Sequence, residues 1–111
     1  MNKFPPIILL IILVSCSNMN REDVYICNGI SPAQAVNEGY RLDFVVKSNE
    51  VIVGRATFPI TSEDDYTITV RNTLNKYSYV KFDKKDETLL DKQTNVTTNV
   101  EYHTMYQCIK L

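Results

Sequence analysis

The sequence has few of the residues from which catalytic sites are built. It contains no Trp, three Gly and a single His, His103. One imidazole without an evident nucleophile or orienting carboxylate does not make a hydrolytic triad, and three scattered glycines form no phosphate-binding loop. Lys and Arg number 12 against 13 Asp and Glu, so no basic excess favours nucleic acid. We therefore expect no catalysis, no nucleic acid partner and no small-molecule substrate.

Cysteine is also scarce, and the first of the three cysteines follows an apolar segment. Residues 4–14 carry no charge, come directly after Lys3 and number 11, whereas a membrane-spanning helix needs about 20. A short apolar core behind a positive charge is typical of an export signal. The segment ends in Leu13-Val14-Ser15-Cys16, which is an aliphatic residue, a tolerant position, a small residue and a cysteine. This order resembles the lipobox of bacterial lipoproteins.

The resemblance implies that Cys16 becomes a lipid anchor. A diacylglycerol would be attached to its sulfur, the chain would be cut before it, and the new amino terminus would be acylated. Two or more acyl chains hold a protein stably in a bilayer, since each buried CH₂ contributes about 0.8 kcal/mol. Ser17, directly after the anchor, implies the outer membrane, with the protein facing the periplasm. A plain signal peptide with a cysteine there by chance is the alternative.

These features divide the chain into three parts. We expect a signal peptide at 1–15, the lipidated cysteine and a polar tether at 16–23, and one β domain at 24–111. Seven flexible tether residues have a reach of about 15 Å. The domain would therefore stay close to the lipid surface.

Two further cysteines lie near the two ends of the expected domain, Cys27 and Cys108. An even pair in an exported protein is typical of a disulfide, because the periplasm is oxidising. Two free buried thiols or a metal pair are the alternatives. With Cys16 acylated and this pair bonded, no thiol is left for zinc. The acidic run 63–65 is typical of a solvated turn rather than of a calcium loop. We therefore expect no metal and no cofactor.

Alternation of apolar and polar residues predicts about seven short strands. They cover 24–29, 40–47, 51–58, 66–71, 77–82, 87–91 and 100–111, with the longest loop at 93–99. Ser31 as a cap followed by Pro32 predicts one or two helical turns at 32–38. The connections are too short for crossover helices, so we expect an all-β fold, an antiparallel meander that forms a small barrel or sandwich. A bond between Cys27 and Cys108 would join the two edges of that sheet.

Tyrosine is the abundant aromatic residue, with seven copies. Tyrosines on a small barrel usually seal its core. The alternative is a contact surface, because Tyr offers a large area at low entropic cost and is enriched in interfaces. Tyr77, Tyr79 and Lys81 alternate with Val80 and Phe82, so we predict that the first three form an exposed partner-binding stripe.

A lipobox, a short tether and Tyr-x-Cys near both ends of a β domain resemble the small periplasmic lipoproteins that include membrane-bound inhibitors of c-type lysozyme. Those inhibitors carry a Ser-Gly-x-x-Tyr loop, and Ser-Gly does not occur in this sequence. We therefore transfer no inhibitory residues from that family. We expect a lipid-anchored envelope protein that binds a macromolecular partner, as a blocker of the lysozyme-inhibitor or phage and plasmid exclusion type. A structural accessory of an envelope or secretion assembly is the alternative.

Overall fold

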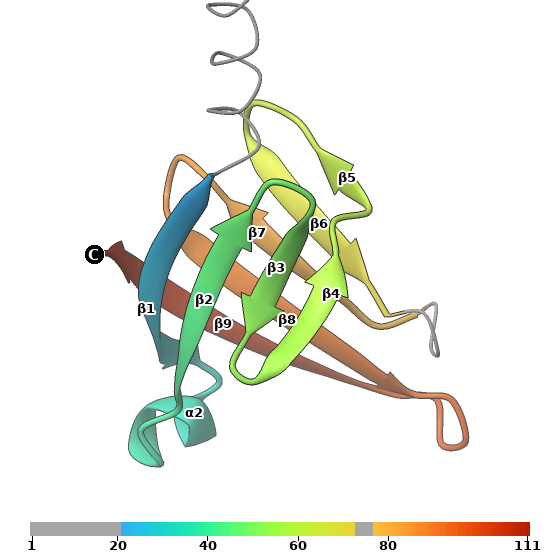
Figure 1. Cartoon of the computed structure of the whole chain (residues 1–111). Coiled ribbons are helices and arrows are strands. Elements are labelled where there is room, and N and C mark those ends of the chain that lie inside the picture. Colours follow the sequence, from blue (N-terminus) through green and yellow to red (C-terminus); the bar gives the residue numbers. More distant parts are fainter. Residues whose placement is uncertain (1–20, 73–76) are drawn as a thin grey trace, which may run out of the picture.

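Two antiparallel meanders form the computed structural model, which describes residues 21–72 and 77–111 (Figure 1). The first contains β1 (Glu22–Ser31), β2 (Arg41–Lys47), β3 (Glu50–Val53) and β4 (Ala56–Pro59), with the short helix α2 (Ala33–Asn37) between β1 and β2. The second contains β5 (Ser62–Glu63), β6 (Thr67–Arg71), β7 (Tyr79–Asp83), β8 (Thr88–Asn95) and β9 (Val100–Lys110). No helix in these two ranges is long and apolar enough to cross a membrane.

The first and last strands join the two meanders into one curled sheet, a half-barrel. The strand order is β4-β3-β2-β1-β9-β8-β7-β6-β5, and all its pairings are antiparallel. The expected all-β antiparallel fold is confirmed. The cysteines do bring the first and last strands together, but these strands lie at the centre of the sheet. Its edges are instead β4 and β5, which the chain connects through Ile60 and Thr61.

The sheet has nine strands among the described residues instead of about seven. Gly54, whose φ is +64°, makes a tight turn with Arg55 that divides the expected strand 51–58 into β3 and β4. The expectation of one strand was wrong because this glycine ends a strand instead of bending it. A further short strand, β5, pairs with β6 at Ser62 and Glu63.

Two other sequence expectations needed correction. The predicted loop 93–99 is strand as far as Asn95, because residues 93–95 pair with residues 100–102 of β9. Thr94 is also buried, and its amide donates to the Ser78 hydroxyl (3.0 Å). The helix near 32–38 is present as α2, but Ser31 ends β1 and the cap position is Pro32, without a side-chain hydrogen bond.

The core lies inside the curl, between the two meanders. Phe44 of β2 and Phe82 of β7 are each 1% exposed, and their ring centroids are 5.0 Å apart. Tyr25 of β1 contacts both rings, with centroids at 6.0 and 4.9 Å. Burying side chains of this size contributes about 1.5–3 kcal/mol each. The half-barrel is therefore stable only when both meanders contribute their inner faces.

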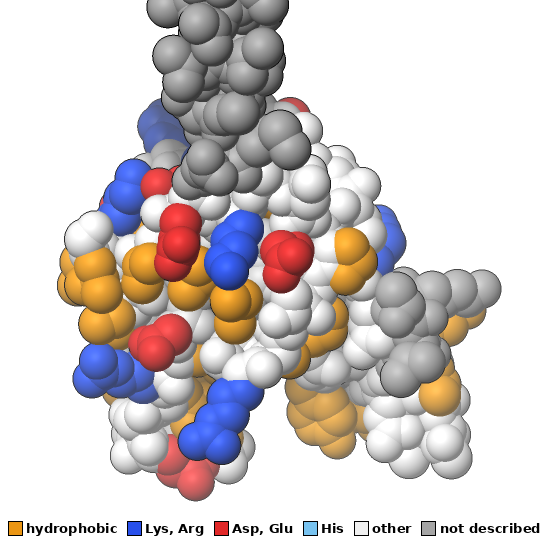
Figure 2. Space-filling model, in the orientation of Figure 1, with side chains coloured by type: hydrophobic (Ala, Val, Ile, Leu, Met, Phe, Trp, Pro, Cys, Tyr) orange, Lys and Arg blue, Asp and Glu red, His pale blue; other side chains and the backbone are white. Residues whose placement is uncertain are grey.

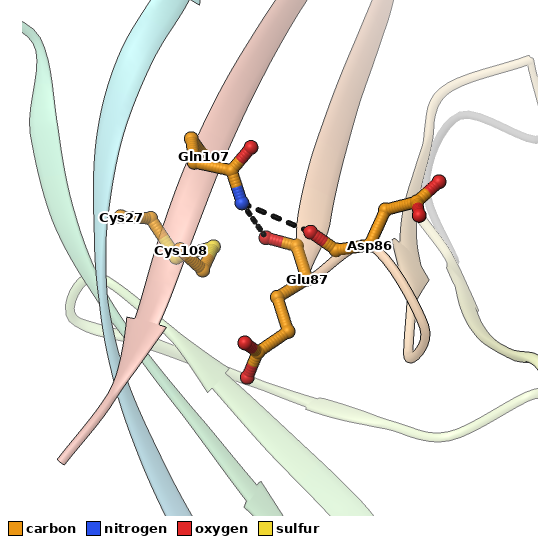
Figure 3. Close-up of a disulfide and its surroundings, with 5 residues drawn as sticks. All are labelled: Cys27, Asp86, Glu87, Gln107 and Cys108. Atoms are coloured by element: carbon orange, nitrogen blue, oxygen red, sulfur yellow. Dashed lines mark hydrogen bonds between the residues drawn. A yellow bond between two sulfur atoms is a disulfide. The ribbon is translucent and has the colours of Figure 1, made fainter.

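The predicted disulfide joins Cys27 to Cys108, which face each other directly in the register of β1 and β9. Both cysteines are buried. Figure 3 shows how the neighbouring Gln107 points away from the disulfide and donates from its side-chain amide to the carbonyl groups of Asp86 (2.9 Å) and Glu87 (3.2 Å). The Glu87 carbonyl also accepts from the Cys108 amide (2.8 Å). These bonds attach the β7–β8 turn to β9.

A group of ion pairs attaches the start of β1 to the edge strand β5. Arg21 donates to both carboxylate oxygens of Glu63 (2.8 and 3.0 Å) and to the Lys47 carbonyl (2.8 Å). Lys84 donates to the same carboxylate at 2.7 Å. The hydrogen bond from Arg21, followed by that from Lys84, lowers the pKa of Glu63 to about 2 despite partial burial.

We predict that Glu63→Gln lowers the free energy of unfolding at pH 7 by about 1 kcal/mol, the upper range for a solvent-screened surface pair. The folded pKa of Glu63 lies below its ordinary value of 4.5, so its stabilising effect is complete above pH 4.5 and is lost as the pH falls toward 2. Urea unfolding of wild type and variant should therefore converge at low pH. Glu38→Gln, on the exposed end of α2, is the control and should match wild type throughout. A difference that does not change with pH would contradict this role.

Candidate functional site

The predicted stripe lies on the outer face of the second meander. Within β7, Val80 and Phe82 point into the core, at 9% and 1% exposed, so Tyr79 and Lys81 point outward. Tyr77, just before the strand, is 53% exposed. Tyr25 and Tyr106, which each lie two residues before a cysteine, are instead buried in the core. The tyrosines therefore divide between core and surface.

Two cations from neighbouring strands flank the ring of Tyr79. The register places Arg71 of β6 and Lys92 of β8 directly opposite Tyr79 on either side. The Arg71 guanidinium carbon is 5.8 Å from the centre of the ring, and the Lys92 Nζ is 5.3 Å from it. These are distances at which the ring quadrupole attracts a cation. The sheet thus holds one aromatic ring between two positive charges.

A second cross-strand row completes the site, because Thr69 of β6 lies opposite Lys81 of β7. Together these side chains surround an open hollow of about 410 Å³, which we call the basic hollow; it is lined by Thr69, Arg71, Tyr77, Tyr79, Lys81 and Lys92. Sequence reasoning missed Arg71 and Lys92, since they belong to other strands and their neighbourhood depends on register. The sequence offered one indication of these two residues, since both are basic and lie at or directly after the end of a predicted strand.

Carboxylates border the basic hollow but do not fill it. Glu101 of β9 pairs with Lys92 (3.3 Å) and with His103 (3.5 Å), and the hydrogen bond from Lys92 lowers the pKa of Glu101. On the other side, Asp83 accepts from the amides of the β7–β8 turn. In residues 21–72 and 77–111, Arg71 and Lys81 make no hydrogen bond or ion pair through their side chains. Their charges face solvent.

The other half of the molecule has a different surface. Figure 2 shows the face over β1–β4, where acidic and basic side chains lie side by side around small apolar areas. On the outer face of β2, for example, Arg41 and Asp43 are neighbours of opposite charge. Mixed charge of this kind has no preferred sign, whereas the basic hollow presents positive charge.

The basic hollow begins in the middle of β6, at Thr69, and extends to the end of that strand that lies away from Arg21. Arg21 contacts Glu63 and Lys84, which lie at the end of the half-barrel where β6 starts. Arg71 ends β6, four residues after Thr67, which corresponds to about 14 Å along the strand. In Figure 1, β6 runs from the upper part of the half-barrel, where β1 begins, down toward the side on which the β8–β9 hairpin lies.

The remaining sequence predictions concern other places. Cys16 lies outside the described residues, while Cys27 and Cys108 are bonded to each other. Only part of the acidic run forms a turn. Glu63 belongs to β5 and binds Arg21 and Lys84, whereas Asp64 accepts from the amides of Tyr66 and Thr67 in the turn that leads to β6. Within the two described ranges, no three His, Cys, Asp or Glu side chains come together in a way that could hold a metal ion.

Comparison with known proteins found no matching family model, no matching curated protein and no matching solved structure. The case for a function therefore depends on the residues themselves and on their geometry.

Proposed function

We propose that this chain is a lipid-anchored protein of the bacterial outer membrane that binds a macromolecular partner through the outer face of β6–β8 and thereby blocks it. The anchor is Cys16, and the contact residues are Tyr77, Tyr79 and Lys81 with their neighbours Arg71 and Lys92. The protein carries out no chemistry on the partner. It acts by covering a surface, as lysozyme inhibitors and exclusion lipoproteins do.

The sequence before the half-barrel supports the anchor. Leu13-Val14-Ser15-Cys16 matches a lipobox at all four positions, and β1 begins only six residues after Cys16, at Glu22. A linker of this length has a reach of about 15 Å. The Arg71–Tyr79 row of the basic hollow lies about 14 Å along β6 from the end at which Arg21 binds, so the hollow would be open to partners in the periplasm.

The single observation that carries the binding proposal is the half-buried, outward-pointing ring of Tyr79 between Arg71 and Lys92. Tyr and Arg are the residue types most enriched among the residues that dominate binding energy. Side chains fixed on paired strands also lose little freedom when a partner binds. A disulfide-bonded sheet is thus a suitable rigid support for a blocking surface.

We predict that the mature protein from cells has a diacylglycerol on Cys16 and an acylated amino terminus, which mass spectrometry of the amino-terminal peptide detects. Cys16→Ala should abolish cleavage before residue 16 and remove the protein from detergent-extracted outer membranes. Cys16→Ser, which keeps the size but not the thiol, is the matched control and should behave in the same way. An unmodified residue 16 in the wild-type protein would rule out the anchor.

For the contact surface, we predict that Tyr77→Ser with Tyr79→Ser reduces capture of the partner from envelope extracts at least about tenfold, as loss of dominant contact residues does. Melting temperature should change little, because both side chains lie outside the core. Tyr40→Ser with Tyr66→Ser, at two exposed tyrosines elsewhere, is the control and should leave capture intact.

Unchanged capture by the Tyr77 and Tyr79 variant would contradict the proposal, and a large fall in melting temperature would assign these residues to the core. Inhibition of the partner's activity by the purified protein supports a blocker. A partner that keeps full activity when bound points to a structural accessory.

A further inference from the structure

We propose that the partner enters the basic hollow with an acidic protein segment, whose Asp or Glu carboxylates bind Arg71 and Lys81. This inference rests on the proposed function and specifies the chemistry of the same surface. It commits to a protein rather than to a lipid, a polysaccharide or a nucleic acid.

The first reason is that the hollow presents cations without internal acceptors. The side chains of Arg71 and Lys81 make no hydrogen bond or ion pair in the described parts of the chain. A guanidinium presents its N–H donors as a planar fork that matches a carboxylate, and charge-assisted bonds of this kind are about twice as strong as neutral ones. Contact with the Tyr79 ring holds the guanidinium over the hollow before binding. Arg71 is therefore positioned for a carboxylate.

The second reason is the size of the positive region. Arg71 and Lys92 are two strand spacings apart, which is roughly 10 Å. Asp83 closes the region along β7, and Glu101 closes it on β9. A long polyanion needs an extended basic track and would meet these two carboxylates. Two or three carboxylates on a short peptide segment fit between them.

The third reason is the composition and place of the hollow. Tyrosine and arginine together are typical of the centre of protein interfaces. Tyr77 also borders a second depression of about 260 Å³, which Thr94, Val96, Asn99 and Glu101 line as well, so a bound segment could extend past the hollow there. The headgroups of the protein's own membrane are a poorer candidate, because the Arg71–Tyr79 row of the hollow lies about 14 Å along β6 from the end at which Arg21 binds.

The test uses the full-length lipoprotein in a neutral detergent and measures the fluorescence anisotropy of a labelled peptide with alternating Glu and Tyr residues. Wild type should bind the peptide, with affinity that falls as salt is raised. Arg71→Gln with Lys81→Gln should weaken binding at least about tenfold, the loss expected for dominant contacts. Arg41→Gln with Lys85→Gln removes one Arg and one Lys from exposed positions elsewhere and should change binding less than about twofold.

A charge reversal gives a positive readout. Arg71→Glu with Lys81→Glu should lose the Glu-rich peptide and bind the matching peptide of alternating Lys and Tyr. Undetectable binding of the Glu-rich peptide to wild type would overturn the inference, and so would an equal loss in the Arg41 and Lys85 control. Stronger binding of dextran sulfate, or of mixed micelles of the same detergent with phosphatidylglycerol, through Arg71 and Lys81 would overturn the inference and assign the hollow to another class of anion.

Failure of the acidic-segment inference can be distinguished from failure of the proposed function. If envelope capture depends on Tyr77 and Tyr79 but not on Arg71 and Lys81, the surface binds a partner that is not acidic. If capture depends on neither pair, the contact surface itself is wrong.

Discussion

The pairing of β1 with β9, fixed by the disulfide between Cys27 and Cys108, is the constraint on which the rest of the half-barrel depends. Each meander alone would expose an apolar inner face, with Phe44 on one and Phe82 on the other. These faces meet only when strands from the two ends of the chain come together. A contact between residues so far apart in the sequence is entropically costly to form. The disulfide joins positions 81 residues apart, restricts the unfolded chain and so lowers the entropy lost on folding.

The same pairing determines where the outer side chains lie. From β9 the register passes through β8 and β7 to β6, so the place of Arg71 beside Tyr79 and Lys92 follows from a continuous ladder of antiparallel pairs. Along each strand, alternate side chains then point into the core and out to solvent. Inward residues such as Tyr25 and Tyr106 pack in the core cluster that contains the disulfide, whereas outward residues contribute little to the core and can differ in charge. A stable core and a charged outer face can therefore coexist on one sheet.

Local patterns in the sequence predicted most of the strands. Apart from the disulfide, features that depend on contacts between distant residues were not predicted. Strict alternation in 40–47 and 77–82 identified both strands and the buried faces with Phe44 and Phe82. The Gly54 turn was misjudged because a glycine in an apolar run can bend a strand or end it, and only pairing decides which. The strand through Thr94 was missed because polar residues at these positions are typical of a loop. The hydrogen bond from the Thr94 amide to Ser78 cannot be read from the local sequence. The cations beside Tyr79 depend on register, which no single segment encodes.

The most direct test of this account is hydrogen–deuterium exchange of the full-length protein with the disulfide intact and reduced. If the β1–β9 seam holds the two meanders together, reduction should remove protection from β2 and β7 together, and should lower the unfolding free energy by about 4 kcal/mol, as expected for a loop of this length. Deprotection confined to the residues beside Cys27 and Cys108, with an unchanged urea midpoint, would show that each meander is stable without the bond and would contradict the account.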